Sequence, residues 1–399
     1  MTQTPDDEAI TALTRAMMSR RLFLRGAGTG AAALALAACG TKGTAKKPAQ
    51  QVATDHSDRD KTLNFSNWPL YIDVDDKTKK KPSLDKFIAS SGIAVKYTED
   101  INDNDEFFGK VHNQLSAGQD TGRDLIVLTD WMAARLVRFH WVEKLDHANI
   151  PNFKNLQPVL QKVGFDPHRD YTLPWQSGLT GISYNPKSSG GPVKTVTELL
   201  TDPRLKGKVT ALTEMRDTIG LIMLEQGKDP EKFTDDDFAN AADMLQKAVS
   251  DKQIRKFTGN DYAQDLAAGN IAAALAWSGD VIQLQADNPK IAFVVPDAGC
   301  MLWSDNMTIP NKAQHKKNAE KLMNFYYDPV NAAMVAAYVN YICPVAGAQE
   351  ELAKTDPGTA KNPLIFPDAA TLKKTHGFKA LDAKTEKKYN DMFQKVIGV

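Results

Sequence analysis

The sequence predicts an α/β protein with about two domains, and two patterns support that prediction. From Lys61 onward, short apolar runs alternate with helical patterns, as in chains that build βαβ units. Several of these runs are continuously apolar, which is typical of parallel strands covered on both faces. The length of 399 residues is sufficient for two domains of ordinary size.

The individual elements follow from these patterns and from the residues that end them. The apolar runs predict strands at Thr62–Ser66, Ile93–Tyr97, Leu125–Leu128, Lys208–Leu212, Ile271–Ala276 and Ile291–Val295. The intervening patterns predict helices at Ser83–Ser90, Asp103–Ala117, Asp217–Gln226, Asp235–Val249, Lys316–Tyr327 and Pro329–Val339. Gly92, Gly118 and Gly227 follow the first three helices, and Thr234 is suited to cap the fourth.

Residues 1–38 have the pattern of a bacterial twin-arginine lipoprotein signal peptide. Arg20 and Arg21 precede an apolar stretch, residues 26–38, that is too short to span a bilayer. The stretch ends in Leu36-Ala37-Ala38-Cys39, which resembles a lipobox, so Cys39 is the predicted lipidation site. An uncleaved anchor is the alternative. Residues 39–60 are predicted to form a flexible tether with a reach of about 25 Å.

Composition excludes some partners and leaves the state of two cysteines open. Lys+Arg and Asp+Glu each number 49, so no overall field favours nucleic acid. After Cys39, only Cys300 and Cys343 remain. Outside the cytoplasm these two could form a disulfide, and two buried free thiols are the alternative.

Catalytic and metal-binding motifs are missing from the sequence. There is no Gly-x-Ser-x-Gly, no His-Glu-x-x-His and no P-loop, and the seven histidines share no ligand spacing. Asp100-x-Asn102-x-Asn104 lacks the glycine and the closing glutamate of a calcium loop. We therefore expect no enzymatic activity, no cofactor and no metal.

Aromatic and acidic residues gather in or near loops that border the apolar runs. They are Trp68, Tyr71, Asp130, Trp131, Glu214, Asp217, Trp277, Asp280, Trp303 and Asp305, with the hydroxyl residue Thr129 beside Asp130. In open α/β sheets ligands bind outside the carboxyl ends of the strands, where such loops meet. Any single tryptophan could be a core residue and any single aspartate a helix cap, but the repeated coincidence indicates a ligand site.

This mixture of side chains suits a polyamine. Aromatic faces attract ammonium groups by about 0.5–2 kcal/mol each. They also cover methylenes, at roughly 0.8 kcal/mol per CH₂. Each ammonium in a closed cleft needs a carboxylate, because an unpaired buried charge is heavily penalised.

The chain resembles the periplasmic spermidine/putrescine-binding proteins of ABC importers over nearly all of the region after residue 60. The motifs that carry the resemblance are Asn67-Trp68-x-x-Tyr71, Asp124–Val127 with Thr129-Asp130-Trp131, Tyr171–Trp175, Glu214-x-x-Asp217, Trp277-x-Gly279, Trp303-Ser304-Asp305, Tyr341 before Pro344, and Phe366–Ala369. The resemblance adds Trp175 and Tyr341 to the candidate ligand-binding residues. Thr129 stands where serine is usual in that family, and Trp131 where tyrosine is usual. The two acids Glu214 and Asp217 occur in the reverse of the usual order.

The resemblance implies a two-lobed periplasmic-binding-protein type II fold that closes by a hinge. It places residues 61–176 and 306–340 in lobe 1, and residues 177–305 and 341–399 in lobe 2. It further implies a polyamine ligand, an ABC permease as membrane partner, and a monomeric protein on the outer face of the membrane. The alternatives are a same-fold binding protein for a sugar, an opine or an amino acid, in which Arg216 could face a carboxylate, and a secreted hydrolase.

Overall fold

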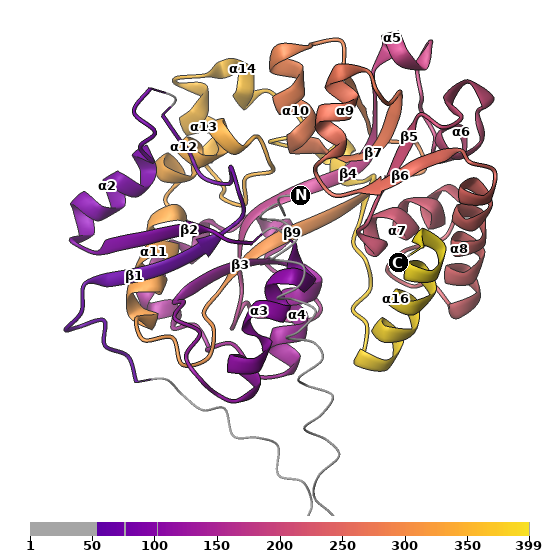
Figure 1. The fold of residues 1–399 in the computed structure, drawn as a ribbon. Coiled ribbons are helices and arrows are strands. Elements are labelled where there is room, and N and C mark those ends of the chain that lie inside the picture. Colours follow the sequence, from indigo (N-terminus) through magenta and orange to yellow (C-terminus); the bar gives the residue numbers. More distant parts are fainter. Residues whose placement is uncertain (1–53, 76, 102, 399) are drawn as a thin grey trace, which may run out of the picture. The chain divides into compact units, whose positions relative to one another are not determined.

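The computed structural model describes residues 54–75, 77–101 and 103–398, which belong to one compact unit (Figure 1). The predicted signal peptide, Cys39 and most of the predicted tether lie outside the described residues. Within the described part of the chain, no helix has the length and apolar character needed to cross a membrane.

The unit is built from α-helices and one mixed sheet. The strands are β1 (Thr62–Asn67), β2 (Ala94–Glu99), β3 (Leu125–Thr129), β4 (Leu173–Tyr184), β5 (Val209–Leu212), β6 (Ile254–Thr258), β7 (Ala273–Trp277), β8 (Ala292–Val294), β9 (Cys300–Thr308) and β10 (Thr375–His376). The helices are α2 (Pro82–Ser91), α3 (Asn104–Ser116), α4 (Asp130–Arg138), α5 (Pro186–Ser189), α6 (Val196–Thr201), α7 (Met215–Glu225), α8 (Asp235–Ser250), α9 (Tyr262–Ala268), α10 (Ser278–Asp287), α11 (Lys316–Tyr326), α12 (Pro329–Val339), α13 (Ala348–Ala353), α14 (Pro357–Ala360), α15 (Ala369–Leu372) and α16 (Ala383–Ile397). The predicted strands and helices are all present, within two residues at either end.

The sequence prediction missed β6 and β10 as well as β4 and β9, the two strands in the middle of the sheet. Gly178 and Gly181 interrupt the apolar pattern of β4, and Ser304, Asp305 and Asn306 interrupt that of β9. Both strands are nevertheless held on two sides, because each pairs with a neighbour on either flank. Pairing across the sheet therefore overrides a weak local preference for strand.

The sheet joins two parallel portions through an antiparallel centre. The strand order is β2-β1-β3-β9-β4-β7-β5-β6, with β1 parallel to β2 and β3, and β5 parallel to β6 and β7. β4 and β9 run antiparallel to each other between these portions, as Figure 1 shows. Each therefore passes from one portion of the sheet to the other.

Separate hydrophobic cores define two lobes. The first lobe is built on β1–β3, where alternate residues of β3 face two different apolar clusters: Leu125 and Val127 point one way, Ile126 and Leu128 the other. The second lobe is built on β5–β7, with α7 and α8 in its core. The predicted α/β class and two-lobed fold are confirmed.

The structure corrects the predicted boundaries at both ends of the folded region. Cys343, Val345 and Leu352, which the sequence reading placed in lobe 2, pack into the core of the first lobe. Helix α16, near the C-terminus, packs on the second lobe as predicted for that part of the chain. At the other end, the predicted tether extends too far, because Ser57 is buried and accepts a hydrogen bond of 3.1 Å from the backbone N–H of Asn318.

The two remaining cysteines are buried free thiols, so the disulfide considered from the sequence is not formed. Cys300 lies in the core of the second lobe and Cys343 in that of the first. Burial raises the thiol pKa of each to about 12, which keeps both protonated and unreactive.

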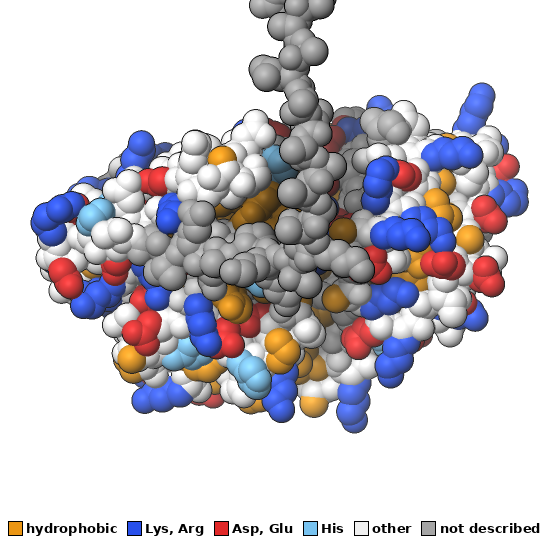
Figure 2. Space-filling model, turned by 90° about the horizontal axis from the view of Figure 1, so that it is seen from below, with side chains coloured by type: hydrophobic (Ala, Val, Ile, Leu, Met, Phe, Trp, Pro, Cys, Tyr) orange, Lys and Arg blue, Asp and Glu red, His pale blue; other side chains and the backbone are white. Residues whose placement is uncertain are grey.

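Charge is mixed over the surface. On the face drawn in Figure 2, Lys and Arg side chains are interspersed with Asp and Glu rather than collected in one field. This agrees with the balanced composition of the chain.

Candidate functional site

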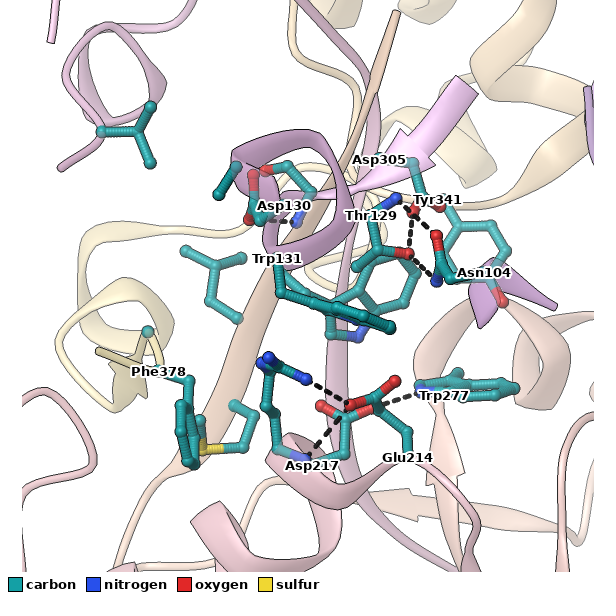
Figure 3. A pocket seen from close by; sticks show the side chains of 18 of the residues that line it. Asn104, Thr129, Asp130, Trp131, Glu214, Asp217, Trp277, Asp305, Tyr341 and Phe378 are labelled. Carbon is teal, nitrogen blue, oxygen red and sulfur yellow. Dashed lines mark hydrogen bonds and ion pairs between the residues drawn. The ribbon is translucent and has the colours of Figure 1, made fainter. Parts of the chain in front are cut away.

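A cleft of about 1380 Å³ receives side chains from both lobes (Figure 3). The sequence-predicted residues that line it are Trp68, Tyr71, Thr129, Asp130, Trp131, Glu214, Asp217, Trp277, Asp280, Trp303, Asp305 and Tyr341. Most of them lie at or just after the carboxyl ends of β1, β3, β5 or β7. The expectation that residues at strand ends gather around a ligand site therefore places them in this cleft.

Trp175 is the exception, because it is a core residue of the first lobe. It is 2% exposed, its ring lies edge-on to Phe65 and Tyr326, and its indole N–H donates a bond of 3.0 Å to the backbone carbonyl of Tyr71. Its place on β4 explains the correction, since alternate residues of a strand face opposite sides. Trp175 supports the loop that carries Tyr71 without reaching the cleft.

Asp305 is an acid of the cleft that two neighbouring hydroxyls hold in place. It pairs with Thr129 across β9 and β3 and is 6% exposed. Its two carboxylate oxygens accept hydrogen bonds from Thr129 Oγ1 at 2.7 Å and from the hydroxyl of Tyr71 at 2.8 Å. Burial raises the pKa of Asp305 to about 7, although both hydrogen bonds oppose that rise.

Asp280 is a second acid held by neutral donors. Its carboxylate accepts bonds from the hydroxyls of Tyr341 at 2.9 Å and Tyr262 at 2.8 Å, and from Asn260 Nδ2 at 2.9 Å. Burial raises its pKa, and these bonds oppose the shift. Tyr341 also touches the ring of Tyr71, so Asp280 and Asp305 are linked through two tyrosines.

The aromatic side chains form a continuous wall along the cleft. Ring contacts run from Tyr71 to Tyr341 at 5.6 Å, from Tyr341 to Trp303 at 5.6 Å, and from Trp303 to Trp277 at 6.5 Å. Two glycines allow this wall to form. A β-carbon on Gly178 would collide with the ring of Trp303, and one on Gly279 would collide with the ring of Tyr341.

Glu214 and Asp217 come from the start of α7, in the second lobe. Glu214 caps the helix by accepting a bond of 3.2 Å from the backbone N–H of Arg216. Asp217 accepts a bond of 2.8 Å from the indole N–H of Trp277. Burial raises the pKa of Asp217 to about 7, and the neighbouring Glu214 adds to the rise. In Figure 3 this group is drawn below Trp131, and Asp305 with Thr129 above it.

Asp130 lines the cleft, but both of its carboxylate oxygens accept hydrogen bonds from within the protein. They accept bonds from the backbone N–H of Ser304 at 2.9 Å and from Asn306 Nδ2 at 2.8 Å. Burial raises its pKa, while the nearby Arg169 opposes that rise. Asp130 thus fixes β9 against α4, and little of its bonding capacity is left for a ligand.

Arg216, which the sequence left as a possible partner of a ligand carboxylate, already has protein partners. Its Nη2 lies 2.8 Å from Glu386 Oε1, and its Nη1 lies 3.6 Å from Glu214 Oε1. Arg216 therefore forms salt bridges within the protein and does not wait for a ligand carboxylate.

Sequence reasoning missed Asn104 and Glu386, which line the cleft, and Tyr262, which lies behind it and holds Asp280. Asn104 follows β2 and begins α3, so the strand-end rule could have found it. Tyr262 and Glu386 lie on α9 and α16 and have no signal in the local sequence. Their roles arise only because those helices pack beside the cleft.

Two compact lobes, joined by antiparallel strands and facing a cleft of acids and aromatic rings, define a solute-binding protein of the two-lobed class. The profile of the family described as bacterial extracellular solute-binding proteins matches residues 83–367. The chain belongs to that family.

Named relatives agree with this assignment. The chain is 26% identical to the spermidine/putrescine-binding periplasmic protein of Escherichia coli K12 over 318 residues, which are 80% of this chain and 86% of the relative. It is 29% identical to the putrescine-binding periplasmic protein PotF of the same organism, over 82% of this chain and 89% of PotF. The structure of the spermidine/putrescine substrate-binding protein PotD of Streptococcus pneumoniae matches with a TM-score of 0.71 and 25% identity, covering 84% of this chain and 98% of PotD.

Proposed function

We propose that this protein binds a polyamine, such as putrescine or spermidine, and delivers it to the permease of an ABC importer. The observation that carries the proposal is a set of buried carboxylates on an aromatic wall, of which Asp217 and Asp305 have pKa values raised to about 7 by burial. An ammonium group would replace the water that these carboxylates have lost. The relatives named for putrescine and spermidine bind ligands of this chemistry.

A neutral sugar or an amino acid fits these side chains less well. A sugar has no charge to offset several buried carboxylates. An amino acid or an opine brings a carboxylate, and Arg216 already holds Glu214 and Glu386. A role in transport agrees with the family of solute-binding proteins. We propose that the protein is not an enzyme.

We further propose that the protein acts as a monomer outside the cytoplasm, anchored through lipid on Cys39. The twin arginine and the lipobox of the sequence support export and lipidation. Metabolic labelling with a fatty acid tests the anchor. Wild-type protein should be labelled and Cys39→Ala protein should not.

A thermal-shift panel tests the ligand class. We expect putrescine or spermidine at millimolar concentration to raise the melting temperature, because a ligand that binds only the folded state stabilises it by mass action. Glucose, glutamate and an opine serve as controls. A shift with one of these controls and none with either amine would refute the proposal.

A further inference from the structure

Arg216 stands where a ligand cation would be expected. The residue is in the first turn of α7, lines the cleft, and is 9% exposed. Its guanidinium lies 4.3 Å from the ring centroid of Trp131, 2.8 Å from Glu386 and 3.6 Å from Glu214. An aromatic face beside two carboxylates is the environment that favours an ammonium group, and here an arginine of the chain occupies it.

Contacts from both lobes hold Arg216 in this position. Glu386, on α16 of the second lobe, also pairs with Arg138 at 3.0 Å and with Arg135 at 3.2 Å. Both of those arginines come from α4 of the first lobe, as does Trp131. Arg216 is therefore a fixed part of the cleft.

The charges in this group balance without a ligand. Arg135, Arg138 and Arg216 face the carboxylates of Glu214, Glu386 and, through Arg135 at 2.9 Å, Asp105. By contrast, among the described residues Asp217, Asp280 and Asp305 form no ion pair within 4 Å, and their donors are neutral. Asp280 already accepts three hydrogen bonds, so ligand cations are needed at Asp217 and Asp305 and not at Glu214.

We propose that Arg216 determines specificity by filling the cation site at Trp131 and Glu214, so that the cleft selects a diamine over a longer triamine. The inference rests on the proposed polyamine function and adds ligand length to it. A diamine places its two ammonium groups on Asp217 and Asp305. The extra ammonium of a triamine would meet a guanidinium of like charge, which repels it.

Calorimetric titration with putrescine and spermidine tests the proposal. We expect the wild-type protein to bind putrescine at least about tenfold more tightly than spermidine. Arg216→Gln should reduce that ratio by about tenfold or more, because it vacates the site and exposes Glu214. Arg216→Lys keeps a cation there and should preserve the wild-type order. Arg255→Gln, an exposed arginine of the second lobe, is the matched control.

The outcomes separate this inference from the proposed function. A wild-type protein that prefers spermidine, or an unchanged ratio in Arg216→Gln, overturns the role of Arg216 and leaves polyamine binding intact. A wild-type protein that binds neither amine rejects the proposed function and the inference together. The order of the two affinities in the wild-type protein can be measured without any variant. It therefore remains a test even if Arg216→Gln does not fold.

Discussion

The two acidic sides of the cleft differ in how their negative charge is compensated. On the first-lobe side, Asp305 accepts hydrogen bonds from the hydroxyls of Thr129 and Tyr71. On the second-lobe side, Glu214 lies next to Arg216, which belongs to a balanced cluster around Glu386. Neutral donors orient a carboxylate but do not cancel its charge. Asp305 therefore depends on a ligand cation for compensation, whereas Glu214 does not.

We expect the largest effect from a substitution that breaks the charge balance on the second-lobe side. Glu386 is 5% exposed, so Glu386→Gln leaves Arg135, Arg138 and Arg216 close together without their shared carboxylate. We expect the free energy of unfolding to fall by about 3–5 kcal/mol. Urea unfolding measures this change.

Glu351→Gln is the control for that experiment. Glu351 pairs with Lys354 on an exposed turn of α13, and its loss should cost about 0.5 kcal/mol or less. Equal destabilisation by the two substitutions would show that the Glu386 cluster is no more important than a surface pair.

The next effect concerns ligand affinity on the first-lobe side. Asp305→Asn removes a buried charge that meets the ligand cation, and we expect binding of putrescine to weaken by about 2–5 kcal/mol in calorimetric titration. Glu214→Gln should weaken binding less, because Arg216 already neutralises Glu214. Asp297→Asn, at a fully exposed carboxylate paired with Lys374, controls for the loss of an acid. Equal losses for Asp305→Asn and Glu214→Gln would remove the distinction between the two sides.

The pH dependence tests a property that both sides share. The pKa values of Asp217 and Asp305 are about 7, above the ordinary 3.8, so both groups take up protons as pH falls from about 8 to about 5. The amines of the ligand stay charged over this range, with pKa values near 10. We expect affinity for putrescine to fall by about tenfold or more, as measured by titration at the two pH values.

Stability without ligand should respond in the opposite direction. Because the folded-state pKa of each group is raised, the protonated form favours folding. The contribution of these groups to stability is complete below pH 3.8 and is lost as pH rises through about 7. Asp305→Asn should flatten both profiles. Affinity that stays constant between the two pH values would argue against carboxylate pairing.

The smallest expected effect concerns the orientation of Thr129. Asn104 Nδ2 donates to Thr129 Oγ1 at 2.9 Å, which leaves the hydroxyl proton of Thr129 directed at Asp305. Asn104→Ala should weaken putrescine binding by about 1 kcal/mol, because the hydroxyl can then turn away. Calorimetric titration measures the loss, with Asn240→Ala on the exposed side of α8 as the control. A loss as large as that of Asp305→Asn would mean that Asn104 contacts the ligand itself.

Much of the fold could be predicted because its signals are local. Continuous apolar runs and capping residues located β1, β3, α8 and α12 to within two residues. β4 and β9 escaped prediction because polar residues and glycines interrupt them where they pass between the lobes. The same interruption brings Asp305 to the cleft, so the least strand-like part of β9 is also the part that carries the site.

The sequence by itself determined which elements form and which acids and aromatic rings follow the strands, because both depend on neighbours a few residues away. Only the tertiary structure decided that Trp175 is core, that Cys300 and Cys343 remain apart, and that Glu214 is already paired. Those outcomes depend on contacts between distant segments, such as Arg216 with Glu386, 170 residues apart, and Thr129 with Asp305, 176 residues apart. Whether a buried acid needs a ligand is set by the charges that such contacts bring beside it.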